Sequence, residues 1–246
     1  MIEPRHLTNA PIKEALIDIW YSLDPGYISR LESIHDKIKG DYPHKQIRKQ
    51  WEGTFQVGSK TFTQSTKDHG IQGYWYLSED EKQIIQARLN GFTFNKIEPY
   101  ETWEQMRDEA RKLWKIFKEI APPEVVTGLG LRYVNRIEIP EPTIELSDYL
   151  TAPPEIPENL PQRLDSFLTR IQFFDSSIKA RGIITQMSEP PDSPGTVPLL
   201  LDIEVTQDNN FNINDDEIWA VLEDLRAFKN KIFFSSITER VAELCQ

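Results

Sequence analysis

The stretch Leu129-Gly130-Leu131-Arg132-Tyr133-Val134-Asn135-Arg136-Ile137-Glu138-Ile139 is mostly apolar at its odd positions and carries charge at several even ones. Side chains of a β-strand point alternately to the two faces of a sheet, so Arg132, Arg136 and Glu138 share a face. The stretch therefore predicts a strand with one apolar face, turned to the core, and one charged face.

The same alternation recurs in residues 12–21, 83–90 and 199–206, each of which reads as a further strand. Two more strands are predicted over residues 163–174 and 178–187. The charged faces of these strands contribute Glu14, Asp18, Arg88, Arg170, Arg181, Asp202 and Glu204. The second face of the predicted sheet is thus either a salt-bridged surface or the wall of a polar cleft. The pattern leaves both alternatives open.

A long amphipathic helix is predicted over residues 103–120. Thr102 and Gln105 have the spacing of a capping box, and apolar residues recur at helical intervals up to Pro122. Strict alternation of strands and helices is missing along the chain. We therefore expect an α+β fold with a largely antiparallel, curved sheet and long helices packed on one face.

Prolines divide the chain. Six of them fall between Pro140 and Pro161, a density that rules out regular structure through most of that stretch. We expect an N-terminal α+β half over residues 1–140, a proline-rich crossover over 141–162 and a C-terminal half over 163–246. The second half contains three strands followed by helix, which loosely echoes the first. An internal duplication and a single integrated domain both remain open.

Composition limits the classes of function. The chain of 246 residues has a net charge of −11, which disfavours broad binding to nucleic-acid phosphates. No apolar run is long enough to span a bilayer, and residues 1–9 lack the apolar centre of a signal peptide. The only cysteine is Cys245. We expect a cytoplasmic protein with no membrane contact.

Two chemical roles suit a cleft lined by these charges. The candidate ligand-binding residues are Arg88, Arg132, Arg136, Arg170 and Arg181, because guanidinium groups bind phosphate and carboxylate oxygens in a fork-shaped geometry. Asp202 and Glu204 could then hold a divalent cation through oxygen ligands. No cofactor is predicted outside that alternative. Ion pairs on a solvated face explain the same residues equally simply.

Catalytic motifs are missing from the sequence. It contains no G-x-S-x-G elbow, no H-E-x-x-H pair and no phosphate-binding G-x-x-x-x-G-K-[ST] loop. The four histidines show no metal-ligand spacing. These observations favour a binding protein over an enzyme.

Aromatic residues form a second candidate site. Within Tyr74-Trp75-Tyr76, either both tyrosines or the tryptophan must point away from the core, because neighbours in a strand face opposite ways. An exposed aromatic side chain there, or at Trp51, would suit a protein partner. Core packing is the competing interpretation of the same residues.

Several segments resemble a sporadically distributed prokaryotic family of uncharacterised proteins. They are Asn9-Ala10-Pro11-Ile12 with Glu14-Ala15, Gly91 to Asn95 with Pro99-Tyr100 and Trp103-Glu104, Leu131-Arg132-Tyr133 with Asn135-Arg136, Leu201-Asp202-Ile203, Lys229-Asn230, Phe233-Phe234, and Ser236 to Glu239. The resemblance implies no activity, cofactor or catalytic residue. Patchy distribution is typical of accessory genes, including defence and toxin-neutralising genes.

Two hypotheses follow. The first is a binding protein that engages a protein partner, of an accessory, defence or toxin-neutralising type, with homo-oligomerisation as a further alternative. The second is a phosphate- or nucleotide-binding or phosphoester-processing protein that uses the charged sheet face. Under the second hypothesis the arginines must converge.

Overall fold

The computed structural model describes residues 3–57, 62–213 and 215–246, with side chains outside 52–66 and 215. Its strands are β1 (Ile12–Tyr21), β2 (His44–Val57), β3 (Phe62–Leu77), β4 (Gln83–Arg88), β5 (Gly91–Ile97), β6 (Val126–Ile139), β7 (Leu168–Asp175), β8 (Ala180–Ser188) and β9 (Val197–Phe211). They form one antiparallel sheet in the order β2-β3-β4-β5-β1-β6-β9-β8-β7. The α+β class and the antiparallel sheet are thus confirmed.

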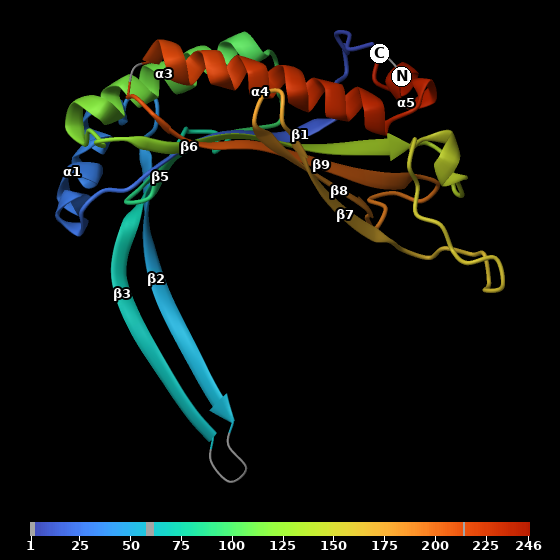
Figure 1. The fold of residues 1–246 in the computed structure, drawn as a ribbon, viewed down its shortest axis with the longest axis horizontal. Coiled ribbons are helices and arrows are strands. Elements are labelled where there is room, and N and C mark those ends of the chain that lie inside the picture. The colour runs from blue at the N-terminus through green and yellow to red at the C-terminus, as the bar shows by residue number, and fades with distance from the viewer. Residues whose placement is uncertain (1–2, 58–61, 214) are drawn as a thin grey trace.

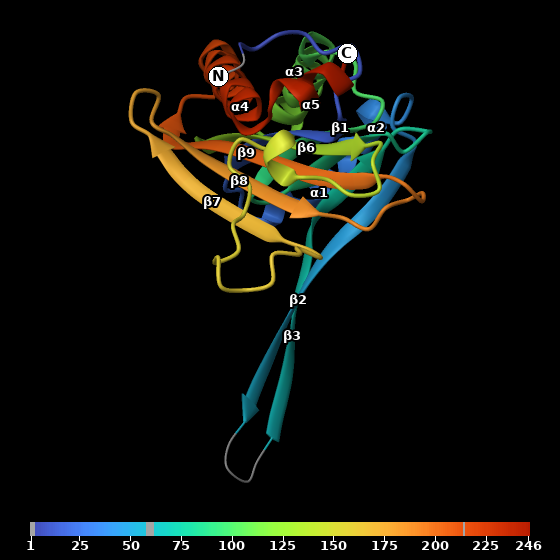
Figure 2. The ribbon, with the colours of Figure 1, turned by 90° about the vertical axis from the view of Figure 1, so that its right-hand side faces the viewer.

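The helices are α1 (Ile28–Ser33), α2 (His35–Ile38), α3 (Trp103–Ile120), α4 (Asp215–Ser236) and α5 (Glu239–Leu244). Figure 1 shows the sheet as an arch, with α3 and α4 lying along its convex side and the β2–β3 hairpin projecting from one end. Figure 2 shows the same hairpin extending well beyond the rest of the molecule. The sheet therefore has a face covered by helices and a concave face beneath the arch.

Two strands lie side by side at the centre of the sheet. β1 pairs with β6. On its other side β1 pairs with β5, and β6 pairs with β9. The helix α3 follows β5, and α4 follows β9. Strands from both sides of residues 141–162 share the sheet.

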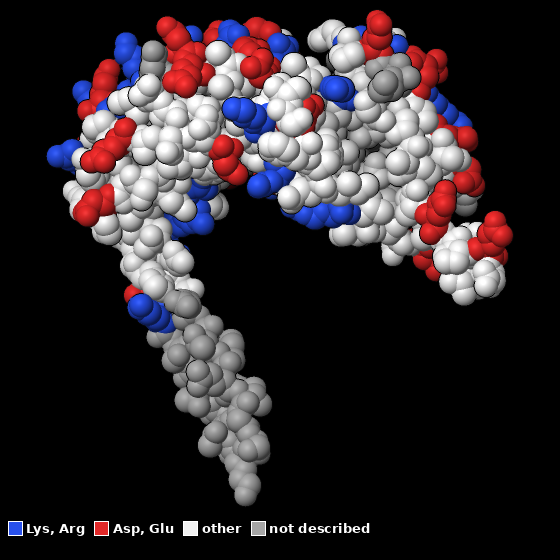
Figure 3. Space-filling view, viewed as in Figure 1, with Lys and Arg blue, Asp and Glu red and all other residues white. Residues whose placement is uncertain are grey.

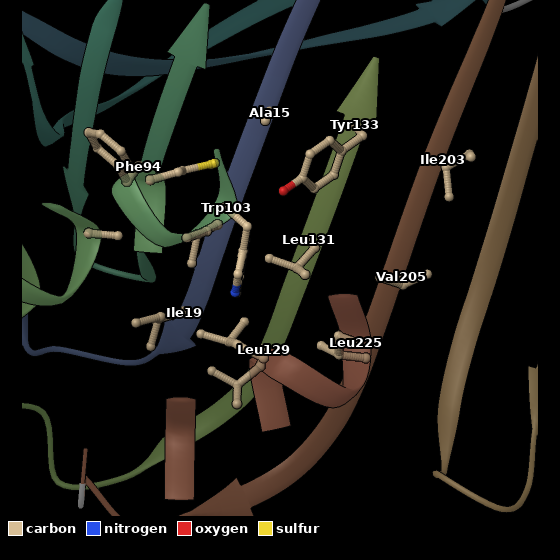
Figure 4. Packing of buried hydrophobic residues seen from close by; sticks show 14 of the residues in the cluster. Ala15, Ile19, Phe94, Trp103, Leu129, Leu131, Tyr133, Ile203, Val205 and Leu225 are labelled. Carbon is tan, nitrogen blue, oxygen red and sulfur yellow. The ribbon is translucent and has the colours of Figure 1, made fainter. Parts of the chain in front are cut away.

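The core lies between the sheet and the helices. Figure 4 shows Ala15, Leu131 and Ile203, from three adjacent strands, on the same side as Trp103 and Leu225 of the helices. The predicted helix over residues 103–120 is confirmed, and Thr102 Oγ1 accepts a hydrogen bond from the Gln105 amide at 3.2 Å. That bond satisfies one of the amides that every helix N-terminus leaves open.

Two predicted elements were wrong. The polar sequence of residues 59–70 predicts a loop, but β3 includes 62–77 and pairs with β2 along the projecting hairpin. Residues 59–61 of that prediction lie outside the described part of the chain. Residues 83–90 were expected to form one strand, but β4 ends at Arg88, and the chain turns at Leu89-Asn90 and continues as β5. Asn90 followed by glycine is a strong turn signal.

Within the described residues no helix is long and apolar enough to cross a membrane.

Candidate functional site

The concave face of the sheet carries the predicted charged residues. Register places them in rows across the strands, with Asp18 opposite Thr93, Arg132 opposite Glu204 and Arg170 opposite Thr185. Directly opposed residues on neighbouring strands point to the same face. Figure 3 shows Lys and Arg side chains along the underside of the arch, whereas many Asp and Glu side chains lie on the outer surface.

Arg88 of β4 lies against Asp18 of β1. The Arg88 Nη2 atom is 3.7 Å from Asp18 Oδ1 and donates to Thr93 Oγ1 at 2.8 Å, and the Thr93 hydroxyl in turn donates to Asp18. Burial raises the pKa of Asp18 and lowers the pKa of Arg88, so desolvation outweighs their mutual attraction for both groups. This pair costs free energy to bury and would cost more if either partner were removed.

Amide side chains extend this network along the face. Gln86 Oε1 accepts from Arg88 Nη1 at 2.9 Å, and Gln86 Nε2 donates to Asn95 Oδ1 at 3.1 Å. Asn95 Nδ2 then donates to Glu14 Oε1 at 2.7 Å. The carboxylates of Glu14 and Asp18 are therefore both held by side chains of strands β4 and β5.

Arg132 of β6 binds Asp202 of β9 through two atoms. Its Nε lies 2.9 Å from Asp202 Oδ1 and its Nη2 lies 2.7 Å from Oδ2. These hydrogen bonds raise the pKa of Arg132, because they stabilise its charged form. The fork-shaped donor pattern of this guanidinium is thus already filled by a carboxylate of the same chain.

The predicted cation ligands have little room to act. Asp202 is engaged by Arg132, so a divalent ion there would have to displace the guanidinium. Glu204 stands opposite Arg132 in the register. Among residues whose placement the structure describes, no group of three or more His, Cys, Asp and Glu side chains could hold a metal ion.

The other three arginines lie away from this centre. Arg136 is surrounded by Glu138, Glu189 at 2.8 Å and Asp192 at 2.6 Å, where β6 meets the loop before β9. Arg181 of β8 is 3.7 Å from Asp208, and exposed Arg170 of β7 donates to Thr185 at 3.3 Å.

These arginines share a face but do not converge. Arg88 and Arg181 lie on strands five positions apart in the sheet order, roughly 24 Å along the sheet at the usual strand spacing. Four of the five guanidinium groups have a carboxylate within 4 Å. The arrangement is a set of separate ion pairs rather than an anion-binding cleft.

Two glycines give the concave face a flat apolar patch. Gly128 and Gly130, two apart in β6, both point to this face, and the Trp20 indole lies over them. A Cβ atom at Gly128 would be 2.6 Å from Trp20 Cε3, which is too close for any side chain. The glycine pair therefore accommodates a tryptophan from β1.

The predicted partner surface is divided by the sheet. Tyr74 and Tyr76 are buried on the helix side, where their hydroxyls donate to Glu32 Oε2 at 3.2 Å and to the Leu31 carbonyl at 2.5 Å. Trp75 is half-buried on the concave face, and Trp51 on β2 is 60% exposed. Of the four aromatic residues, only Trp51 offers a largely exposed side chain.

Sequence reasoning missed an apolar edge. Strand β7, at the end of the sheet, exposes Leu168, Ile171 and Phe174 by 65%, 53% and 64%. The signal was available, because a spacing of three places Ile171 on the opposite face from the other two. A strand that exposes apolar residues on both faces lacks the usual protection of an edge.

Comparisons with known proteins give no further assignment. No protein-family model matches the chain, and no curated protein matches it at a significant level.

Proposed function

We propose that this protein is a binding protein and that the β7 edge receives an extended segment of a protein partner as an additional strand. The observation that carries the proposal is the exposure of Leu168, Ile171 and Phe174 on one short edge strand. In strand addition, main-chain hydrogen bonds supply affinity and alternating side chains supply specificity. The apolar residues of β7 would contact such a segment on both faces of the sheet.

The opposite edge of the sheet supports this choice. Strand β2 carries Lys45, Arg48 and Lys49 in its first half, and charged residues of this kind discourage pairing with another chain. In β7 the only charged residues are Arg170 and Asp175. The two edges thus differ in protection, and β7 is the one open to a new strand.

A groove beside β7 offers a place for side chains of the partner. This hollow of about 450 Å³ lies between β7 and α4 and is lined by Ile171, Phe173, Phe228 and Ile232 among others. A strand added to β7 would direct every second side chain toward the groove. The partner segment should therefore alternate apolar and polar residues, with the apolar ones on the helix side.

The setting of this interaction is part of the proposal. We infer that the protein works in the cytoplasm as an accessory protein of the defence or toxin-neutralising type. We also infer that the chain contains two similar units, residues 12–120 and 126–236, with the boundary before β6 rather than at residues 141–162. In each unit the first strand, β1 or β6, is central and pairs with the strand that precedes a long helix. The helices α3 and α4 cover the convex face of the sheet, so the β7 edge and the concave face are left for partners.

Affinity capture from a lysate of the native cell tests the β7 edge. Wild-type protein should retain a partner that Ile171→Lys loses. Pairing with the partner would bury the introduced lysine in the apolar groove between β7 and α4, which is costly. Leu160→Lys is a matched control, since Leu160 is also exposed, at 54%, but precedes the strand. A partner retained equally by all three proteins would contradict the proposal.

A second copy of the chain is the competing occupant of this edge. Antiparallel pairing of two β7 strands about Ile171 would place Leu168 opposite Phe174, which is self-complementary. Light scattering of the purified protein separates the cases, because the monomer has a mass of 28.7 kDa. A stable dimer that Ile171→Lys dissociates would show self-pairing and overturn the proposal of a separate partner.

A further inference from the structure

A second cavity lies on the helix side of the sheet, between the N-terminal segment, the start of α3, β6 and the second half of α4. Its volume is about 340 Å³, and small-molecule sites commonly measure about 300–1,000 Å³. Its aromatic wall is formed by Tyr100, Trp103, Tyr133, Phe233 and Phe234. Figure 4 shows Trp103 and Tyr133 on this side of the sheet.

Lys229 of α4 lines this cavity together with Arg226, Asn230, Phe233 and Phe234 of the same helix. Its residue surface is only 9% exposed, and its Nζ atom lies 3.9 Å from the centroid of the Tyr133 ring. Within the described part of the chain, Lys229 makes no hydrogen bond and no ion pair. A buried amine without an acceptor is rare in proteins, because burial of an unpaired charge is costly.

Burial, with a smaller contribution from the nearby positive charge of Arg226, lowers the pKa of Lys229 to about 7. A large fraction of this amine is therefore neutral near pH 7. Neutral lysine is a nucleophile toward carbonyl carbon, and a desolvated lysine beside another cation is the usual means of activating it.

Hydroxyl and amide groups stand in the same wall. The hydroxyls of Tyr100 and Tyr133 are 3.2 Å apart, and burial raises the pKa of both phenols. They remain protonated and can exchange protons with each other or with a ligand. Asn135 donates through Nδ2 to the carbonyls of Tyr133 and Leu201, which leaves its Oδ1 as an acceptor.

The remaining charged groups of the wall carry both signs. Arg226 stands one turn before Lys229 on α4 and lies 3.5 Å from Glu104 and 3.6 Å from Glu223. The N-terminal segment adds Arg5 and His6, and Glu101 lies at the start of α3. Arg226 holds Glu104 and Arg5 contacts Glu239, so Lys229 is the one lysine or arginine of the described wall without a carboxylate contact.

We propose that this cavity binds a small aldehyde or α-oxo acid and that Lys229 Nζ attacks its carbonyl carbon to form an imine. The nitrogen lone pair forms the C–N bond while the carbonyl oxygen takes up a proton, which gives a carbinolamine. Loss of one water, with departure of the second amine proton, then gives the C=N bond. Amine and carbonyl compound are thus converted to imine and water, with no oxidation or reduction.

Reductive trapping of wild-type protein tests the proposal. The probe is glyoxylate, which is both an aldehyde and an α-oxo acid, supplied in limiting amount near pH 7 with cyanoborohydride. Hydride reduces the imine and leaves a carboxymethyl group on the lysine nitrogen. Peptide mass mapping should place most of this group on Lys229. Adduct spread over exposed lysines such as Lys115, with none on Lys229, would overturn the proposal.

Variants separate the role of Lys229 from general lysine reactivity. Lys229→Met should lose the trapped adduct, whereas Lys115→Met should keep it. Arg226→Gln should shift the pH midpoint of trapping upward, because removal of a neighbouring positive charge favours protonated Lys229. The control Arg240→Gln changes an arginine that pairs with Glu141 and Asp148 instead, and its midpoint should stay unchanged.

Wild-type mapping decides the question even if Lys229→Met fails to fold. An unchanged midpoint in folded Arg226→Gln, together with slow trapping at Lys229, would show a structural lysine and contradict the proposed site.

Discussion

Two cationic regions of this molecule differ in what surrounds the charge. On the concave face, Arg88 and Arg132 each lie against a carboxylate from a neighbouring strand. In the cavity beneath α4, Lys229 faces aromatic rings and has no acceptor within the described residues. The number of positive charges would rank the concave face first as a ligand site. The cavity ranks first when the criterion is a nitrogen atom without a carboxylate partner, because Lys229 Nζ has none within the described residues.

The difference has a common physical origin in solvation. Exposed pairs on the open sheet face, such as Arg181 with Asp208, remain near water and form at little cost. The more buried charges of Arg88 and Asp18 on the same face compensate each other. Under α4, burial removes water from the Lys229 amine, and no carboxylate of the described residues pairs with it. A strand rich in charged residues therefore indicates solvent-exposed ion pairs as readily as a binding site. One buried ionisable group without a partner points more directly to a functional site.

The largest effect is expected where the pairing on the concave face is broken. Asp18→Asn keeps the shape of the side chain but leaves the charge of Arg88, which is only 16% exposed, without its carboxylate. We expect the free energy of unfolding to fall by about 3 kcal/mol, measured by urea denaturation. A loss below about 1 kcal/mol, the range of exposed pairs, would show that this pair is effectively solvated.

A smaller effect on the free energy of unfolding is expected at Lys229, where stability should depend on pH. The lowered pKa, about 7 in the folded protein, lies below the value of about 10.4 for lysine in an unfolded chain. Between these values the unfolded state binds more protons, so stability rises with pH.

The matched variant Lys229→Met isolates this pH dependence. Between about pH 7 and about pH 9, wild type should gain about 2 kcal/mol of stability relative to Lys229→Met. Denaturation curves of both proteins at the two pH values measure the difference. Parallel pH dependence of the two proteins would mean that Lys229 is protonated in the folded state.

Asp202→Asn should cost about 1 kcal/mol or less, because Arg132 is 45% exposed and water can replace the carboxylate. The substitution should also open the guanidinium of Arg132 to anions. Inorganic phosphate should then raise the melting temperature of Asp202→Asn but not of wild type. An equal shift in wild type would show that the arginines are available without any substitution.

The smallest effect is expected at the rim of the concave face. Arg181 is 45% exposed and lies 3.7 Å from Asp208, so Arg181→Ala should change stability by no more than about 0.5 kcal/mol. Arg170→Ala is the companion variant, with a hydrogen bond to Thr185 in place of an ion pair. A larger loss at Arg181 than in Asp202→Asn would reverse the order proposed for this face.

Local patterns predicted much of the fold. The alternation in residues 129–139 and the apolar stripe with Thr102 as its cap identified β6 and α3 correctly, because the period of each element is written into its own residues. The first part of β3 escaped detection because its sequence is polar and lacks the alternation that marks a half-buried strand.

The candidate sites were less predictable. Alternation placed Arg88, Arg132 and Arg181 on one face, but distance across the sheet depends on strand order, which no single strand encodes. In the sequence, Lys229 stood out only through the Lys229-Asn230 pair of the family resemblance, which implied no role for it. Its burial was not predictable, because its environment combines Tyr133 of β6 with Arg226 of α4.

The contrast between the two regions is tested most directly by an NMR titration of the lysine side-chain amines, with Lys229 assigned from the spectrum of Lys229→Met. We predict that the Lys229 amine titrates with a midpoint near 7, because burial disfavours its charged form. A midpoint near 10.4, the ordinary value for lysine, would show a solvated and protonated amine and would contradict the proposed difference between the cavity and the concave face.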